Sequence, residues 1–174
     1  MGSIGIRAKP KEIIFAIYKN ENVFLDSILL PDFLKNEEKL SYLRNALNDI
    51  FNEFEIKNGA LKIMEGNIKS INNGVFRRIE NETIIKEILY SSGIENYKML
   101  KNSNLSSLLS EDKSIVTELV KGKRTKKSKF TEEYFSKELE KFEIKINALK
   151  GIKNEQEREA VVSAFISNNK GIKE

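Results

Sequence analysis

The chain has 174 residues, of which 40% are hydrophobic and 32% charged, with 30 Lys and Arg against 26 Asp and Glu. This length suits one domain, no apolar run approaches the roughly 18 residues of a membrane span, and no secretory hydrophobic region follows Met1. The chain has no cysteine and no histidine, which excludes disulfides, thiolate nucleophiles, Ser-His triads and His- or Cys-ligated metals. We therefore expect a cytoplasmic domain. Any chemistry would use carboxylates, Lys, Arg or hydroxyls, together with a hard cation such as magnesium or manganese.

Positive charge is concentrated in one segment of an otherwise nearly neutral chain. Residues 121–129 contain no acid and six basic residues, namely Lys121, Lys123, Arg124, Lys126, Lys127 and Lys129. Subtracting these six from the 30 basic residues leaves 24 against 26 acids. Such a run can follow a nucleic-acid backbone and release its counterions, although a solvated lysine-rich loop is the alternative. We expect nucleic acid as the partner, with DNA favoured, and an acidic protein as the second choice.

The first thirty residues predict three strands joined by turns. Residues 4–8 are apolar at alternate positions, residues 12–19 contain an almost continuous apolar run, and residues 23–30 are stopped by Pro31. Strands this close in sequence form an antiparallel meander. We expect Met1–Ser3 to be an expression remnant, residues 4–168 to form a single domain with a basic loop at 121–129, and residues 169–174 to be a polar tail.

A helix, a strand, a second helix and another strand follow. Apolar residues recur every three or four positions between 40 and 54, with Asn36 as the expected N-cap and Gly59 as the stop. Residues 60–65 predict a short strand that ends on Glu65, and residues 66–74 a loop. We expect the second helix over 75–91 and the next strand over 96–100.

The remaining chain is expected to be helical apart from the basic segment. Short helical turns are predicted around 105–109 and 115–120, and a longer helix after Thr131. Asn154 and Glu157 have the spacing of a capping box before the last helix. Its apolar face consists of Val161, Val162, Phe165 and Ile166. A meander followed by helix-linked parallel strands predicts an α/β fold with a mixed five-stranded sheet and helices on both faces.

Four short motifs give this order of elements a resemblance to a known family. They are Ile4-Gly5-Ile6-Arg7, Lys62-Ile63-Met64-Glu65, Gly74-Val75-Phe76-Arg77-Arg78 and Glu159-Ala160-Val161-Val162-Ser163-Ala164. They resemble the first strand, the fourth strand, a glycine-containing helix start and the last helix of the ribonuclease H-like superfamily, in particular its RuvC resolvase branch.

The resemblance implies a nuclease site in which carboxylates hold two magnesium or manganese ions. That family has an aspartate on the first strand, where this chain has Arg7, which cannot bind a metal. Gln156 stands where an acid of the last helix is expected. The acids that remain are Glu65 and Glu159 as candidate catalytic residues, joined by Glu155 as candidate metal ligands. Acids in a first helical turn also stabilise it against the helix dipole, which is the ordinary explanation for those of the last helix.

The basic candidates also have two interpretations. Arg7 could clamp a phosphate with its planar guanidinium or pair with an acid such as Glu65. Arg77 and Arg78 could contact nucleic acid, or pair along their helix with Glu80 and Glu82.

The sequence favours a nucleic-acid-associated domain that resembles RuvC and has impaired or lost nuclease activity. The alternatives are an active magnesium- or manganese-dependent DNA nuclease, and a non-catalytic protein-interaction subunit of a larger assembly. Convergence of Glu65 and Glu159 around a space for a cation would favour catalysis. An Arg7–Glu65 ion pair in that space would oppose it.

Overall fold

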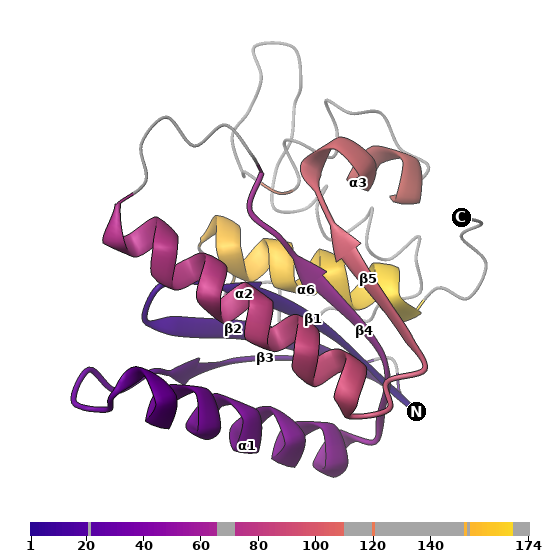
Figure 1. Ribbon diagram of the computed structural model, residues 1–174. Coiled ribbons are helices and arrows are strands. Elements are labelled where there is room, and N and C mark those ends of the chain that lie inside the picture. The colour runs from indigo at the N-terminus through magenta and orange to yellow at the C-terminus, as the bar shows by residue number, and fades with distance from the viewer. Residues whose placement is uncertain (21, 66–71, 110–119, 121–151, 153, 169–174) are drawn as a thin grey trace.

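Five strands form one mixed sheet in the order β3-β2-β1-β4-β5 (Figure 1). The structure is a computed structural model, and it describes residues 1–20, 22–65, 72–109, 120, 152 and 154–168. Strands β1 (Gly2–Ala8), β2 (Glu12–Lys19) and β3 (Asn22–Leu29) form an antiparallel meander. Strand β4 (Ile56–Lys62) runs parallel to β1, and β5 (Asn96–Leu100) runs parallel to β4. The predicted α/β fold with a mixed five-stranded sheet is confirmed.

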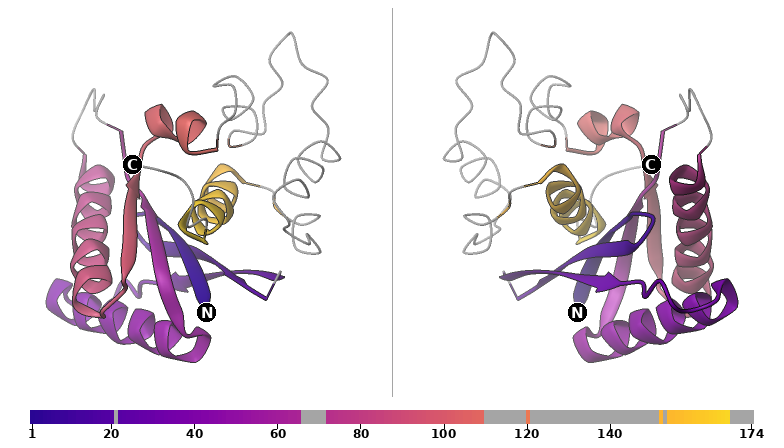
Figure 2. Two further views of the ribbon diagram at one scale, coloured as in Figure 1. Left: turned by 90° about the vertical axis from the view of Figure 1, so that its right-hand side faces the viewer. Right: turned by 90° about the vertical axis from the view of Figure 1, so that its left-hand side faces the viewer.

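Helices cover both faces of the sheet (Figure 2). Helices α1 (Asn36–Phe54) and α2 (Asn73–Ser91) pack on one face, and α6 (Glu155–Asn168) packs on the other. Helix α3 (Asn102–Leu109) follows β5. The period-two alternation of β1 divides its side chains between the two layers. Ile4 and Ile6 join the α1–α2 core, whereas Gly5 faces α6.

Gly5 lets α6 approach the sheet closely. A Cβ at this position would overlap the backbone of Ala160 and Ala164 on α6. A side chain larger than hydrogen is therefore excluded here by the helix backbone itself, which cannot move aside as a flexible side chain would.

The segment between α1 and β4 differs from the prediction. Lys35 rather than Asn36 is the N-cap of α1, and the helix ends at Glu55, whose backbone is left-handed with φ 53°. Gly59 does not stop the helix, because it lies inside β4, where its Cα packs against the Leu89 side chain of α2. Strand β4 accordingly spans 56–62 rather than 60–65. Its last residue is Lys62, and Glu65 lies three residues beyond it.

Other elements lie close to their predicted bounds. Strands β2 and β5 coincide with the predicted ranges, and β1 begins at Gly2, with the buried Ser3 hydroxyl donating to Asn168 Oδ1 at 3.0 Å. Asn154 accepts from the Glu157 N–H at 2.9 Å, so the predicted cap of α6 is present. The basic loop 121–129, the predicted helix after Thr131, residues 115–119 and the tail 169–174 lie outside the described residues. Among the helices of the described part, none is long and apolar enough to cross a membrane.

Candidate functional site

Strands β1 and β4 end side by side and present two cations to α6. Arg7 and Lys62 are register partners across the parallel pair. Each lies two positions after a residue that packs on α6, which are Gly5 in β1 and Ala60 in β4. Because side chains two apart in a strand point to the same face, both cations meet Glu159 in the first half of α6.

Arg7 is held on three sides by acceptors. Its Nε contacts Glu159 Oε2, its Nη1 donates to the Lys62 carbonyl oxygen at 3.0 Å, and the same Nη1 lies 3.9 Å from Glu82 Oε1. Arg7 is only 8% exposed. Arg7 therefore pairs with acids, as one of its two predicted interpretations requires. Its partners are Glu159 and Glu82 rather than Glu65.

Lys62 places an ammonium group between the two predicted catalytic carboxylates. Its Nζ lies 3.8 Å from Glu159 Oε1 and 3.9 Å from Glu65 Oε1, and it donates to the Ile63 carbonyl oxygen at 3.2 Å. The residue is 2% exposed. The cation that lies between these carboxylates is thus a side chain of the protein.

Helix α2 contributes a further acid from the opposite layer. Both Glu82 carboxylate oxygens accept from the Met64 N–H, at 3.0 and 3.2 Å, and Oε1 also accepts from Arg78 Nε at 2.9 Å. We call the resulting group the charge cluster. It balances three cations against three carboxylates, and its members are Arg7, Lys62, Glu65, Arg78, Glu82 and Glu159.

Burial changes the proton affinity of one member of the charge cluster. Glu159 is 3% exposed, and this burial raises its pKa from 4.5 to about 7. The surrounding charges act in both directions, since Lys62 and Arg78 lower the pKa of Glu159, whereas Glu155 and Glu65 raise it. Removing a carboxylate from water disfavours its ionised form, and the adjacent cations offset that cost only in part.

The predicted metal ligands do not fit a metal site. Glu65 accepts from the N–H groups of Asn102 and Ser103 at the start of α3, with the second contact at 3.3 Å. Glu159 faces Arg7 and Lys62, as described above. Within the described residues, no three acids converge as metal ligands, so Glu65, Glu155 and Glu159 do not form the expected set. A divalent cation there would meet a guanidinium and an ammonium at close range, which opposes its binding.

The two arginines at the start of α2 have different environments. Arg78 pairs with Glu82, which confirms the interpretation that it pairs along its helix. Arg77 is exposed and forms no ion pair with a described acid. Its predicted nucleic-acid contact, like those of the residues in 121–129, stays a prediction.

The sequence analysis did not place Lys62 or Glu82 in the site, although it paired Glu82 with the arginines of its own helix. Lys62 carries a signal in retrospect, because it interrupts the apolar run Ala60–Met64 at a position that faces the same way as Ala60. A charge at a position where the pattern requires burial indicates a buried ion pair.

Comparison with solved structures identifies the fold. The RuvC of Thermus thermophilus matches with a TM-score of 0.62 and 9% sequence identity, covering 95% of this chain and 92% of that chain. The same values describe the Thermus thermophilus RuvC in complex with a Holliday junction substrate. No family model and no curated protein matches the sequence. The chain therefore has the ribonuclease H-like fold in the form found in RuvC.

Proposed function

We propose that this chain is a nucleic-acid-binding domain of RuvC-like fold that does not hydrolyse phosphodiester bonds. The observation that carries the proposal is the charge cluster, in which Arg7 and Lys62 lie against the carboxylates at the carboxyl ends of β1 and β4. Two-metal hydrolysis needs carboxylates free to hold two cations. Here cationic side chains of the protein already lie against Glu159 and Glu65.

Two observations support nucleic acid as the partner. One is the six basic residues in 121–129. The other is the shared fold with a protein whose structure contains a Holliday junction substrate, which favours DNA. Contacts of Lys and Arg with phosphates release counterions, so we expect an affinity that falls steeply with salt.

Fluorescence anisotropy with labelled single-stranded, duplex and four-way DNA tests this part of the proposal. Replacing Lys123, Arg124, Lys126 and Lys127 with Glu should abolish the anisotropy rise and leave the melting temperature nearly unchanged. Unchanged affinity in this variant would remove the basic segment from the proposal. No rise with any DNA or RNA probe would contradict nucleic-acid binding altogether.

A thermal-shift experiment tests, without measuring activity, whether the charge cluster leaves room for a metal ion. A ligand that binds only the folded state raises its melting temperature, so millimolar manganese should leave the melting temperature of the wild-type chain unchanged relative to EDTA. A rise that disappears in the Glu159→Gln variant would mean that this carboxylate does hold a metal, and the active-nuclease alternative would then be preferred.

The protein-interaction alternative has one observation of its own. An apolar pocket lies between α1 and α2, on the face of the sheet opposite to α6.

A further inference from the structure

Helices α1 and α2 diverge toward their N-terminal ends (Figure 1). Two polar contacts join them farther along: Arg44 pairs with Glu87 at 2.8 Å, and Ser92 donates to Asn48 at 2.7 Å. Glu87 lies in the C-terminal part of α2, and Ser92 is the residue that follows its end. Toward the N-terminal ends a pocket of about 320 Å³ lies between the helices.

The walls of this pocket are apolar and partly exposed. They are formed by Leu30 after β3, by Leu40 of α1 and by Phe76, Ile79 and Ile84 of α2. Phe76 is 57% exposed and Ile79 is 38% exposed. Side chains of this size in contact with water around a concave surface are the usual mark of a binding site, since burial of their surface on binding is favourable.

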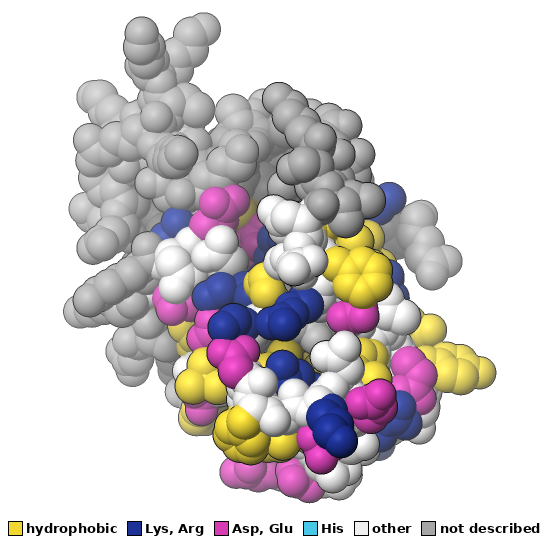
Figure 3. Space-filling model, turned by 60° about the vertical axis from the view of Figure 1, so that its left-hand side comes forward, with side chains coloured by type: hydrophobic (Ala, Val, Ile, Leu, Met, Phe, Trp, Pro, Cys, Tyr) yellow, Lys and Arg dark blue, Asp and Glu magenta, His cyan; other side chains and the backbone are white. Residues whose placement is uncertain are grey.

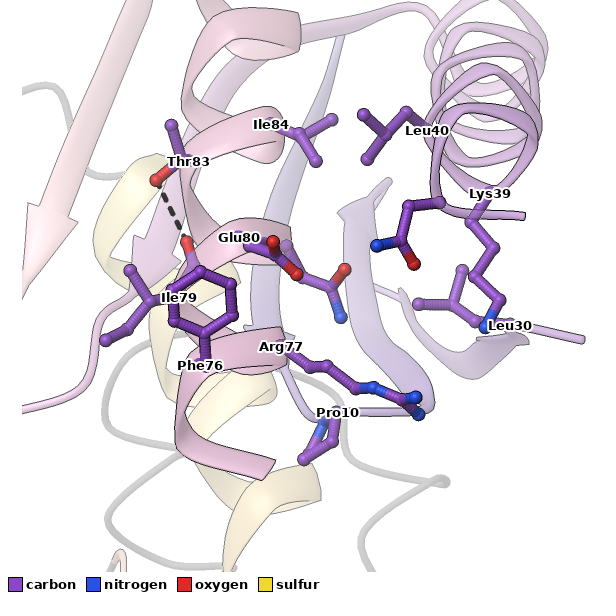
Figure 4. A pocket seen from close by; sticks show the side chains of 12 residues that line it. Pro10, Leu30, Lys39, Leu40, Phe76, Arg77, Ile79, Glu80, Thr83 and Ile84 are labelled. Carbon is purple, nitrogen blue, oxygen red and sulfur yellow. Dashed lines mark hydrogen bonds between the residues drawn. The ribbon is translucent and has the colours of Figure 1, made fainter. Parts of the chain in front are cut away.

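Two cations point to one end of the pocket from opposite helices. Figure 4 shows Lys39 of α1 and Arg77 of α2 directed toward the side where Leu30 and Pro10 lie. Neither forms an ion pair with an acid of the described residues. Figure 3 shows basic side chains on this side of the molecule, interspersed with acidic and hydrophobic ones.

Asp32 shows how these two cations act on a carboxylate, although it does not itself line the pocket. Asp32 pairs with Lys11 at 2.6 Å, and its pKa is lowered first by that contact and further by the fields of Lys39 and Arg77. The two cations therefore stabilise an acid placed beside them. Glu80 also lines the pocket, so acids of a partner can pair favourably only with Lys39 and Arg77.

We propose that this pocket binds a short segment of a partner protein in which acidic residues adjoin large apolar side chains. The apolar side chains would fill the space between Leu40, Phe76 and Ile84, and the acids would pair with Lys39 and Arg77. The inference does not depend on the basic segment 121–129, since Lys39 and Arg77 lie outside it. It gives Arg77 an alternative to the nucleic-acid contact predicted from the sequence.

Selection from a phage-displayed library of random short peptides against the intact chain tests the proposal. Enriched peptides should combine acidic and large apolar residues. Synthetic copies should bind roughly tenfold or more weakly to the Lys39→Glu, Arg77→Glu double variant and to Phe76→Ser, as expected for residues at the centre of an interface. Because Phe76 is well exposed, its replacement keeps the test valid if the charge-reversed variant fails to fold.

Matched controls separate this surface from a general charge effect. Lys57 and Lys101 are exposed and do not line the pocket, and neither does the 74% exposed Tyr90. The Lys57→Glu, Lys101→Glu double variant and Tyr90→Ser should bind the peptides within about twofold of the wild type. The proposal is overturned if no peptide is enriched, if enriched peptides lack acids, or if the pocket variants bind like the controls. It is also overturned if the Lys39→Glu, Arg77→Glu variant loses duplex DNA binding instead, since the surface would then serve nucleic acid.

Discussion

At the scale of single residues, Arg7 and Glu159 depend on each other. Above pH 7, where Glu159 is ionised, replacing Arg7 with Met should lower the free energy of unfolding, because a carboxylate that is 3% exposed would lose its guanidinium partner. Removing one partner of a buried pair costs about 3–5 kcal/mol. Urea denaturation followed by circular dichroism measures this loss.

Two further variants show whether that loss comes from the buried ion pair. The Arg7→Met, Glu159→Leu double variant should recover much of the loss, because it removes both buried charges. Lys11→Met breaks an ion pair whose two side chains are each 62% exposed, and it should cost far less. An Arg7→Met chain as stable as Lys11→Met would mean that the charge cluster does not hold the site together.

The titration of Glu159 should make stability depend on pH near neutrality. Burial raises the pKa of Glu159 to about 7, above its ordinary value of 4.5, so the folded chain binds this proton more tightly than the unfolded chain. The stability that the proton contributes is therefore full below about pH 4.5 and is lost as the pH rises through about 7. The melting temperature should fall over this window. Glu159→Gln, which cannot ionise, should flatten the slope, and an unchanged slope would assign it to other groups.

At the scale of elements, Gly5 determines how closely α6 packs on the sheet. Gly5→Ala should strongly destabilise the chain, because the new Cβ would overlap the α6 backbone at Ala160 and Ala164. Gly74→Ala is the matched control, since a Cβ there meets its nearest atom, Asn72 Oδ1, at 3.3 Å. At Gly74 only the Asn72 side chain has to shift, whereas at Gly5 the α6 backbone blocks the new Cβ. Thermal denaturation compares the two, and equal losses would contradict the close approach of α6 and β1.

The role of Glu65 can be tested through α3. Its carboxylate accepts from backbone N–H groups at the start of that helix, so Glu65→Ala should weaken α3 by about 0.5–2 kcal/mol, the usual cost of losing a helix cap. Amide hydrogen exchange should be faster in Asn102–Leu109 and nearly unchanged in β1. Unchanged exchange in α3 would leave Glu65 free for the functional role predicted from the sequence.

Some strands can be predicted from local sequence alone, and β4 cannot. Strands β2 and β5 coincide with their predicted ranges because apolar runs bounded by turn residues are local signals. The sequence predicts the start of β4 four residues too late, because Lys57-Asn58-Gly59 has the composition of a turn. Its pairing with β1 and β5 is a non-local interaction that outweighs this composition. The predicted strand therefore ends at Glu65 rather than at Lys62. As a result, Glu65 and not Lys62 was expected at the site.

At the scale of the whole molecule, the order of elements was enough to predict the fold. The replacement of an acid by a cation at the end of the first strand is visible in the sequence as Arg7. The second cation near Glu159 is not, because Lys62 meets Glu159 across 97 positions of the chain. The charge balance of a buried cluster depends on such contacts between distant elements.

We propose that this domain of RuvC-like fold binds DNA without cleaving it, and a single experiment can test both parts of that proposal. A fluorescently labelled four-way DNA junction is mixed with the chain in manganese, and both its anisotropy and its strand lengths on a denaturing gel are followed over time. We expect a salt-sensitive rise in anisotropy that stays constant, with all strands intact. A rise that decays while shorter strands accumulate would contradict it, because the carboxylates paired with Arg7 and Lys62 would then support hydrolysis after all.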